Sequence, residues 1–89
     1  MATQIDLLLN IYAIERAGRY TTIYALRKLS KMSHGRCKRL LEDLEDKNLV
    51  YTGTRMYHGN IGTTEYNLTP YGSTVAHAII SAEAMRMPY

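Results

Sequence analysis

The chain has 89 residues, of which 46% are hydrophobic and 21% are charged. This balance is typical of a folded domain and excludes the low-hydrophobicity, high-charge composition of disordered chains. No apolar run approaches the roughly 20 residues that span a bilayer, and the N-terminus lacks the basic leader of a signal peptide. We therefore expect residues 1–89 to form a single cytoplasmic, intracellular domain without a membrane segment. Because so small a core leaves apolar surface uncovered, we also expect a homodimer.

Positive charge is concentrated in one part of the chain, although the net charge is only +3. Residues 16–39 hold eight lysines and arginines and no carboxylate, whereas residues 40–50 hold four carboxylates and one lysine. Unopposed positive charge at this density predicts a polyanionic partner. The alternative interpretation is a solvated basic face without a ligand.

Residues 3–18 are predicted to form the first helix. Thr3 followed by Asp6 is close to a capping box, and Gly18 can adopt the left-handed conformation that ends a helix. The apolar positions that recur at helical spacing, and that we expect to face the core, are Ile5, Leu8, Leu9 and Tyr12. Residues 19–21 are long enough only for an extended link or a short strand.

A second and a third helix follow with a short turn between them. Thr21 or Thr22 caps a helix that runs to about Lys31, and Ser33 caps one that runs to about Lys47. The inward positions are Ile23, Leu26 and Leu29 in the second helix, and Cys37, Leu40, Leu41 and Leu44 in the third. Asn48 tolerates the left-handed conformation at the end of the third helix. Two helices joined by residues 31–33 are a helix-turn-helix candidate.

After Asn48 the composition changes to that of strands. Residues 50–57 and 63–68 are rich in Tyr and Thr, and the turn signal at 58–62 between them predicts a β-hairpin. Thr69 and Pro70 then open a fourth helix over about residues 70–86. Its apolar stripe, which we expect to form the two-fold interface of a homodimer, consists of Val75, Ile79, Ala82 and Met85. The expected fold class is α+β, mainly α.

This chain resembles the winged helix-turn-helix transcriptional regulators, including the MarR-like, PadR-like and small archaeal and archaeal-viral groups. Residues 29–50 match with Met32 and Ser33 at the turn, Cys37 at a small apolar position, and the closing Leu49-Val50. Residues 66–72, YNLTPYG, resemble the Y-x-L-T-x-x-G by which such wings return to a final helix. The resemblance implies a helix-turn-helix over about 22–47, a wing over about 50–68, a C-terminal dimerisation helix over about 70–86, and a regulator that binds DNA.

The third helix carries the predicted recognition surface. At about 100° per residue, Gly35, Lys38, Arg39 and Glu42 lie opposite its apolar stripe, so its exposed N-terminal half is basic and its C-terminal half acidic. This polarity suits insertion of the N-terminus into the major groove of double-stranded DNA. The candidate residues are Ser33, His34, Gly35, Arg36, Lys38 and Arg39, with Arg39 and Lys38 expected to read base edges. Alternatively, Gly35 is a helix residue without a role, and Arg36 or Arg39 pairs with Asp43.

Further DNA contacts are expected outside this helix. Candidates for the DNA backbone are Arg19, Arg27, Lys28 and Lys31, and candidates on the wing are Arg55, His58 and Asn60. The wing is equally consistent with an ordinary solvated hairpin. The eight tyrosines would suit stacking on bases. However, five of them lie in helical stripes or alternate on strands, and we interpret these as half-buried core: Tyr12, Tyr24, Tyr51, Tyr57 and Tyr66.

No pattern in the chain predicts catalysis. The lone cysteine, Cys37, cannot form an internal disulfide and is expected to be an inert core thiol, and three histidines beside it do not favour a zinc site. A Gly-rich phosphate loop and a nucleophile elbow are also missing from the sequence. We expect no enzyme, no metal and no cofactor, with double-stranded DNA, a second copy and a protein of the transcription machinery as partners. The alternative functions are a winged-helix module that docks an acidic protein, and a nonspecific chromatin or RNA binder.

Overall fold

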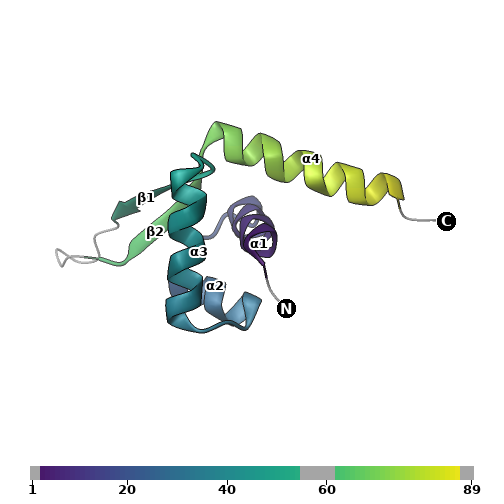
Figure 1. Ribbon diagram of the computed structural model, residues 1–89. Helices are drawn as coiled ribbons and strands as arrows, with labels where there is room; N and C mark the ends of the chain where they lie inside the picture. The colour runs from purple at the N-terminus through teal and green to yellow at the C-terminus, as the bar shows by residue number, and fades with distance from the viewer. Residues whose placement is uncertain (1–2, 55–61, 87–89) are drawn as a thin grey trace.

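The computed structural model describes residues 3–54 and 62–86 (Figure 1). Three helices come first, α1 (Gln4–Arg16), α2 (Ile23–Ser30) and α3 (His34–Asp46). The strands β1 (Val50–Thr54) and β2 (Thr64–Leu68) follow, and α4 (Pro70–Arg86) closes the described chain. This order confirms the mainly helical α+β winged-helix arrangement that the sequence predicts. Within the described residues, no helix is both long enough and apolar enough to cross a membrane.

The helices begin at the predicted caps. At the start of α1, Asp6 Oδ2 accepts the backbone N–H of Thr3 at 2.7 Å, while Thr3 Oγ1 accepts the backbone N–H of Asp6, which completes a capping box. Thr22 caps α2 and Ser33 caps α3 in the same way, each accepting a backbone N–H three residues on. Local polar side chains therefore set where each of the first three helices starts.

The helix ends use the left-handed conformation. Gly18 (φ 73°) and Asn48 (φ 60°) adopt it as predicted, directly after the C-caps of α1 and α3. Lys31 (φ 52°) also adopts it, at the C-cap of α2, which the sequence did not indicate because lysine has no special preference for this region. The left-handed Lys31 reverses the chain into the short turn before α3.

The hairpin is an antiparallel pair with Val50 opposite Leu68 and Thr54 opposite Thr64. The predicted extended link before α2 pairs with β2. Thr22 bridges Glu65, and the Tyr66 N–H donates to the Thr21 carbonyl at 2.9 Å. The predicted turn at residues 58–62 falls almost entirely outside the described residues.

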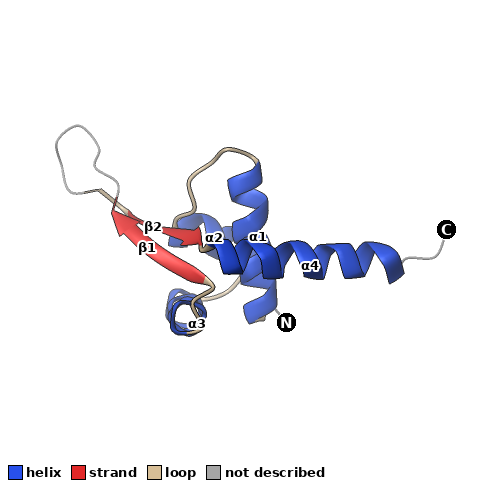
Figure 2. Ribbon diagram, turned by 90° about the horizontal axis from the view of Figure 1, so that it is seen from above, coloured by secondary structure: helices blue, strands red, loops and turns tan. Residues whose placement is uncertain are grey.

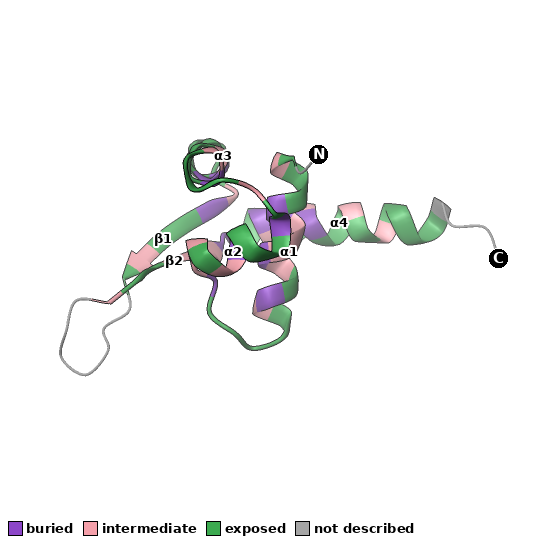
Figure 3. Ribbon diagram, turned by 90° about the horizontal axis from the view of Figure 1, so that it is seen from below, coloured by how far each residue is buried: buried purple, intermediate pink, exposed green. Residues whose placement is uncertain are grey.

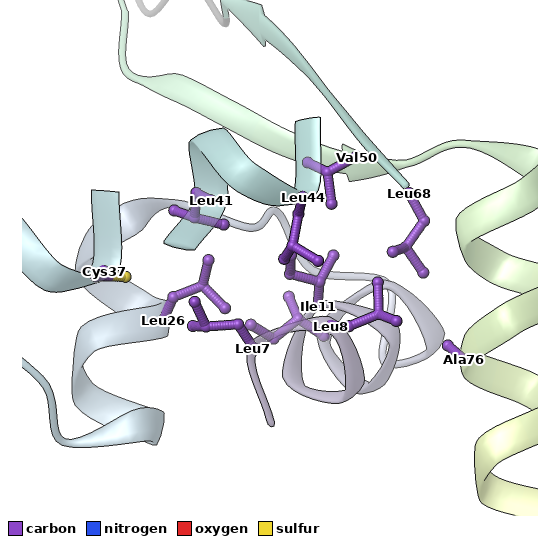
Figure 4. Close-up of a cluster of buried hydrophobic side chains, with 11 residues drawn as sticks. Leu7, Leu8, Ile11, Leu26, Cys37, Leu41, Leu44, Val50, Leu68 and Ala76 are labelled. Atoms are coloured by element: carbon purple, nitrogen blue, oxygen red, sulfur yellow. The ribbon is translucent and has the colours of Figure 1, made fainter. Parts of the chain in front are cut away.

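The core lies where α1, α2, α3 and the base of the hairpin meet (Figure 4). Its fully buried side chains come from each of these elements and include Leu7, Ile11, Leu26, Cys37, Leu41, Leu44 and Val50. Polar contacts join the helices at the rim of the core. Asn10 Nδ2 of α1 donates to Ser30 Oγ of α2 at 2.8 Å, and Lys47 Nζ after α3 donates to Gln4 Oε1 of α1 at 2.7 Å.

The predicted inward stripe of α1 is partly wrong. The helix buries Leu7, Leu8, Ile11 and Ile14, whereas Ile5 is exposed. Leu9 and Tyr12 are half-buried against the core, as the sequence predicts for Tyr12. Its sequence contains two overlapping apolar stripes at helical spacing, and packing against α2 and α3 selects one of them. Leu29 of α2, also predicted to face inward, is exposed because Leu26 and Ser30 occupy the buried side of that helix.

The start of α4 is hydrogen-bonded to the residues that directly follow α3. The Thr69 N–H donates to the Leu49 carbonyl at 3.1 Å, and Thr69 Oγ1 donates to the Asn48 carbonyl at 2.7 Å. The same hydroxyl accepts the Gly72 N–H at 2.9 Å and so caps α4. A Cβ at Gly72 would lie 1.9 Å from the Leu49 carbonyl oxygen, so only glycine allows this approach. This contact gives a physical reason for threonine and glycine in the segment YNLTPYG.

Beyond this junction α4 crosses α1 and projects away from the rest of the molecule (Figure 2). Ala76 is buried where the helices cross, whereas Ile80 and Met85 are exposed farther along. The projecting half of α4 therefore carries apolar surface that its own chain does not cover.

Candidate nucleic-acid interface

The third helix lies at an outer edge of the molecule, with one face buried and the other open to solvent (Figure 3). Cys37, Leu41 and Leu44 are buried, and Leu40 is half-buried beside them. The exposed side holds His34, Gly35, Lys38 and Arg39, as the helical period of about 100° per residue predicts. Arg36 flanks this side and is half-buried.

Charge changes sign along the exposed side of α3. Lys38 and Arg39 lie in its N-terminal half, and the carboxylates Glu42, Asp43, Glu45 and Asp46 are exposed in its C-terminal half. The N-terminal end also presents backbone N–H groups and the positive end of the helix dipole, although Ser33 Oγ accepts one of these N–H groups. The two effects add, so this end of α3 attracts anions and the other end repels them.

Helix α2 extends the positive charge next to α3. Arg27, Lys28 and Lys31 are all exposed. We refer to these three residues together with His34, Lys38 and Arg39 as the basic surface. A hollow of about 180 Å³ on it is lined by Tyr24, Arg27, Lys28 and Met32.

Tyr24 lies on this surface, not in the core. Its side chain is 65% exposed, and Lys28 Nζ lies 5.3 Å from the centroid of its ring, a cation–π contact. The interpretation of Tyr24 as half-buried core is therefore wrong, because the inward side of α2 is already filled by Leu26 and Ser30.

Two cations of the basic sequence block lie elsewhere. Arg16 is on α1, with its guanidinium carbon 5.7 Å from the centroid of the Tyr12 ring. Arg19 is in the link between α1 and α2, which Figure 2 places on the opposite side of the hairpin from α3. Arg19 thus precedes α2, whereas Arg27 and Lys28 lie in the last turn of α2 and Lys31 is its C-cap. The wing candidates Arg55, His58 and Asn60 lie outside the described residues.

The predicted interface residues of α4 divide into two pairs. Val75 and Ile79 are half-buried against the core of their own chain, whereas Ala82 and Met85 are exposed, Met85 by 86%. Ile80, which is not part of the predicted stripe, is also exposed. Its place in the chain next to Ile79, a member of that stripe, is the one sequence signal that could have indicated it.

The buried titratable groups lie apart from the basic surface, except for Cys37 beneath it. Burial raises the pKa of the Cys37 thiol, and the nearby positive charge of Arg27 only partly opposes this shift. Burial also raises the pKa of Tyr66, which is half-buried as predicted. Within the described residues no group of three or more His, Cys, Asp and Glu side chains is placed to hold a metal ion.

Glu15 of α1 is the other perturbed group. Its carboxylate accepts the backbone N–H of Leu68, with 3.3 Å between Oε1 and nitrogen, and so ties α1 to the end of β2. Burial raises the pKa of Glu15, and this hydrogen bond partly opposes the shift. Beside it, Tyr12, Glu15, Arg16 and Ser73 line a hollow of about 240 Å³ between α1 and α4. Nothing in the sequence pattern distinguished Glu15 from the other polar residues of this helix.

The fold is shared with several solved structures. The chain is similar to AF1382 from Archaeoglobus fulgidus, with a TM-score of 0.82 and 19% identity over 96% of this chain and 89% of that one. It is also similar to MepR, a transcription regulator of the Staphylococcus aureus multidrug efflux pump MepA, with a TM-score of 0.72 and 23% identity. ZitR from Lactococcus lactis gives a TM-score of 0.69 at 17% identity.

The extent of these matches differs. The chain covers 54% of MepR and 53% of ZitR, so it spans about half the length of each. The sequence matches no protein-family model and no curated protein. At these identities the similarity concerns the fold, and the chain has the winged helix-turn-helix fold that the regulator MepR also has.

Proposed function

We propose that this chain is a sequence-specific double-stranded DNA-binding protein that acts as a homodimeric transcription regulator. The observation that carries the proposal is the basic surface, which consists of exposed cations in the N-terminal half of α3 and on α2, the helix that packs against it. Residues 1–89 act as one winged-helix domain in this proposal.

The charge pattern of α3 supports an orientation with its N-terminus in the major groove. Lys38 and Arg39 then face base edges, where arginine is the commonest specific partner of guanine. Arg27, Lys28 and Lys31 of α2 lie along the phosphate backbone beside the groove. The carboxylates at the other end of α3 stay outside the groove, away from phosphate.

The projecting half of α4 supports dimerisation. Ile80 and Met85 are exposed on a part of the helix that contacts little of its own chain, and a second copy would remove them from water. Two copies would present two α3 helices to successive major grooves about 34 Å apart, which predicts a pseudo-palindromic site.

The proposal is tested first by binding to a labelled random-sequence duplex, followed by fluorescence anisotropy at several salt concentrations. Five or more phosphate contacts give a log–log slope of affinity against salt of about −4.5 or steeper. Selection from a random duplex library then tests for a preferred sequence. The absence of duplex binding even at low salt would refute the proposal and favour a protein partner for the basic surface.

Single variants separate base reading from general charge. Arg39→Ala is expected to relax the selected sequence at one position and to weaken specific binding by about 1–3 kcal/mol. Arg16→Ala removes the same charge from α1, where Arg16 lies against the Tyr12 ring and is not part of the basic surface, and is expected to bind nearly as the wild type does. Equal losses in both variants would show that net charge alone drives binding, which is the nonspecific alternative.

A further inference from the structure

Tyr24 of α2 is an exposed aromatic side chain that none of the DNA contacts proposed above uses. It is 65% exposed, more than the other exposed tyrosines that the structure describes, which are Tyr20, Tyr51 and Tyr71. Tyr51 points away from the core because its neighbour Val50 is buried and side chains alternate along a strand, so the interpretation of Tyr51 as half-buried core is wrong. Exposure alone does not indicate a role, and the surroundings of Tyr24 have to do so.

These surroundings are positively charged. Residues three and four positions apart share one face of a helix, and Arg27 and Lys28 stand at these distances from Tyr24. Both side chains are exposed. Lys28 Nζ lies 5.3 Å from the centroid of the Tyr24 ring, so the ring holds this ammonium group beside it. The outer face of α2 therefore combines one aromatic ring with two positive charges.

The same residues line a hollow next to α3. Tyr24, Arg27, Lys28 and Met32 surround a volume of about 180 Å³. Met32 directly precedes Ser33, the N-cap of α3, so the hollow adjoins the end of α3 that is proposed to enter the major groove. Pockets for whole small molecules measure about 300–1,000 Å³. A hollow below this range suits one group of a larger ligand.

The lining has the chemistry that a sugar-phosphate unit requires. Arg27 and Lys28 supply N–H donors for phosphate oxygens. The Tyr24 ring and the Met32 thioether supply apolar surface for the carbon atoms of a deoxyribose. No carboxylate of the described residues lines this hollow, whereas the hollow between α1 and α4 contains Glu15, which repels phosphate when it is ionised.

The position of α2 fits the edge of a major groove. Helix α2 packs against α3, and the axes of packed helices are about 8–10 Å apart. The major groove is about 12 Å wide. When α3 lies in the groove, a strand at the edge of the groove therefore runs beside α2, within reach of the hollow.

We infer that Tyr24 contacts the DNA backbone, and that the hollow around it holds one sugar-phosphate unit of the duplex at the edge of the major groove. Arg27 and Lys28 bind the phosphate, with Lys28 held in place by the ring, while the ring and Met32 contact the sugar. The inference rests on the proposed function. Because contacts to the backbone position a protein on DNA without reading bases, Tyr24 contributes affinity for every sequence and fixes the position of α3.

The test uses the full chain in fluorescence anisotropy with a random-sequence duplex and a selected duplex. Tyr24→Ala is expected to weaken binding to both duplexes by about three- to ten-fold, because the sugar loses its contact and Lys28 loses its support. Tyr24→Phe keeps the ring and is expected to keep most of the affinity. Tyr71→Ala is the matched control, because Tyr71 is 58% exposed on α4, which begins at the opposite end of α3 from α2 (Figure 1).

Three readouts separate this role from a structural one. Lys28→Ala is expected to reduce the slope of affinity against salt by about 0.9, which corresponds to one phosphate contact. In the double variant with Tyr24→Ala, the losses are expected to be less than additive, because the ring acts partly through the ammonium group. Tyr24→Ala is expected to keep the midpoint of urea unfolding, because its side chain is exposed.

Failure of the inference is distinguishable from failure of the proposed function. If the wild type binds the duplex and Tyr24→Ala binds equally well, or Tyr71→Ala loses as much, the inference is overturned and the proposed function stands. A loss confined to the selected duplex would indicate base reading and would also overturn it. Additive losses, or a loss in Tyr24→Phe as large as in Tyr24→Ala, would overturn the role of the ring. Absence of duplex binding by the wild type would overturn both proposals.

Discussion

Replacing Gly72 by alanine tests whether the contact between α4 and the end of α3 holds the fold together. The new Cβ would lie 1.9 Å from the Leu49 carbonyl oxygen, and ordinary contact begins near 3.4 Å. The first turn of α4 must therefore move by about 1.5 Å relative to Leu49. Such a shift breaks or stretches the two hydrogen bonds that Thr69 makes to the carbonyls of Asn48 and Leu49.

The expected loss in free energy of unfolding is about 2–4 kcal/mol. Overpacking a well-packed contact costs about 1–3 kcal/mol, and each weakened hydrogen bond contributes up to about 1 kcal/mol. A domain of this size has roughly 4–13 kcal/mol of stability, so the loss is easily measured. Urea unfolding followed by circular dichroism at neutral pH should show a lower midpoint with an unchanged slope.

Gly35→Ala is the matched control for this experiment. Gly35 lies in α3 with nothing within 4 Å of an added Cβ, so alanine there gains helix propensity without a clash. We expect Gly35→Ala to stabilise the protein by about 0.5–1 kcal/mol. A Gly72→Ala variant within about 0.5 kcal/mol of the wild type would refute the reasoning, because surface substitutions commonly have effects of that size.

Four further predictions follow from burial and exposure. Leu44→Ala, at a side chain that is 1% exposed, should cost about 2–5 kcal/mol in urea unfolding; a loss below 1 kcal/mol would contradict its place in the core. Because burial raises the folded-state pKa of Glu15, stability is favoured below the ordinary glutamate pKa and declines as pH rises through the folded-state value. Glu15→Gln should therefore gain stability relative to wild type as pH rises above the ordinary glutamate pKa of about 4.3, and a constant difference would argue against the shift. The Cys37 thiol, buried with a raised pKa, should react with a disulfide reagent only after unfolding, and rapid reaction of the native protein would contradict this. Ile80→Asp should lower the molar mass measured by light scattering if α4 forms the dimer, while Tyr71→Asp should not.

Much of the local structure could be predicted because its causes are local. Thr3, Thr22 and Ser33 cap helices through bonds that span three residues, and Asn48 ends α3 through its own tolerance of the left-handed region. The polarity of α3 follows from the helical period once its buried stripe is known, and that stripe was unambiguous. These features depend on neighbours in the sequence, which are visible without any tertiary contact.

Contacts between distant segments could not be predicted in this way. The two apolar stripes of α1 are equivalent in sequence, and only packing against α2 and α3 exposed Ile5 and buried Leu7. The division of the basic block between the link before α2 and the helix α3, which lie on opposite sides of the hairpin, depends on the path of that link (Figure 2).

The sequence by itself determined the helices, their caps, the hairpin and the charged face of α3, because hydrophobic period, capping and turn chemistry act over a few residues. Only the tertiary structure decided that Gly72 lies against Leu49 and that Thr22 bridges Glu65. Each of these pairs joins residues more than twenty positions apart, and their proximity results from how the elements share one small core.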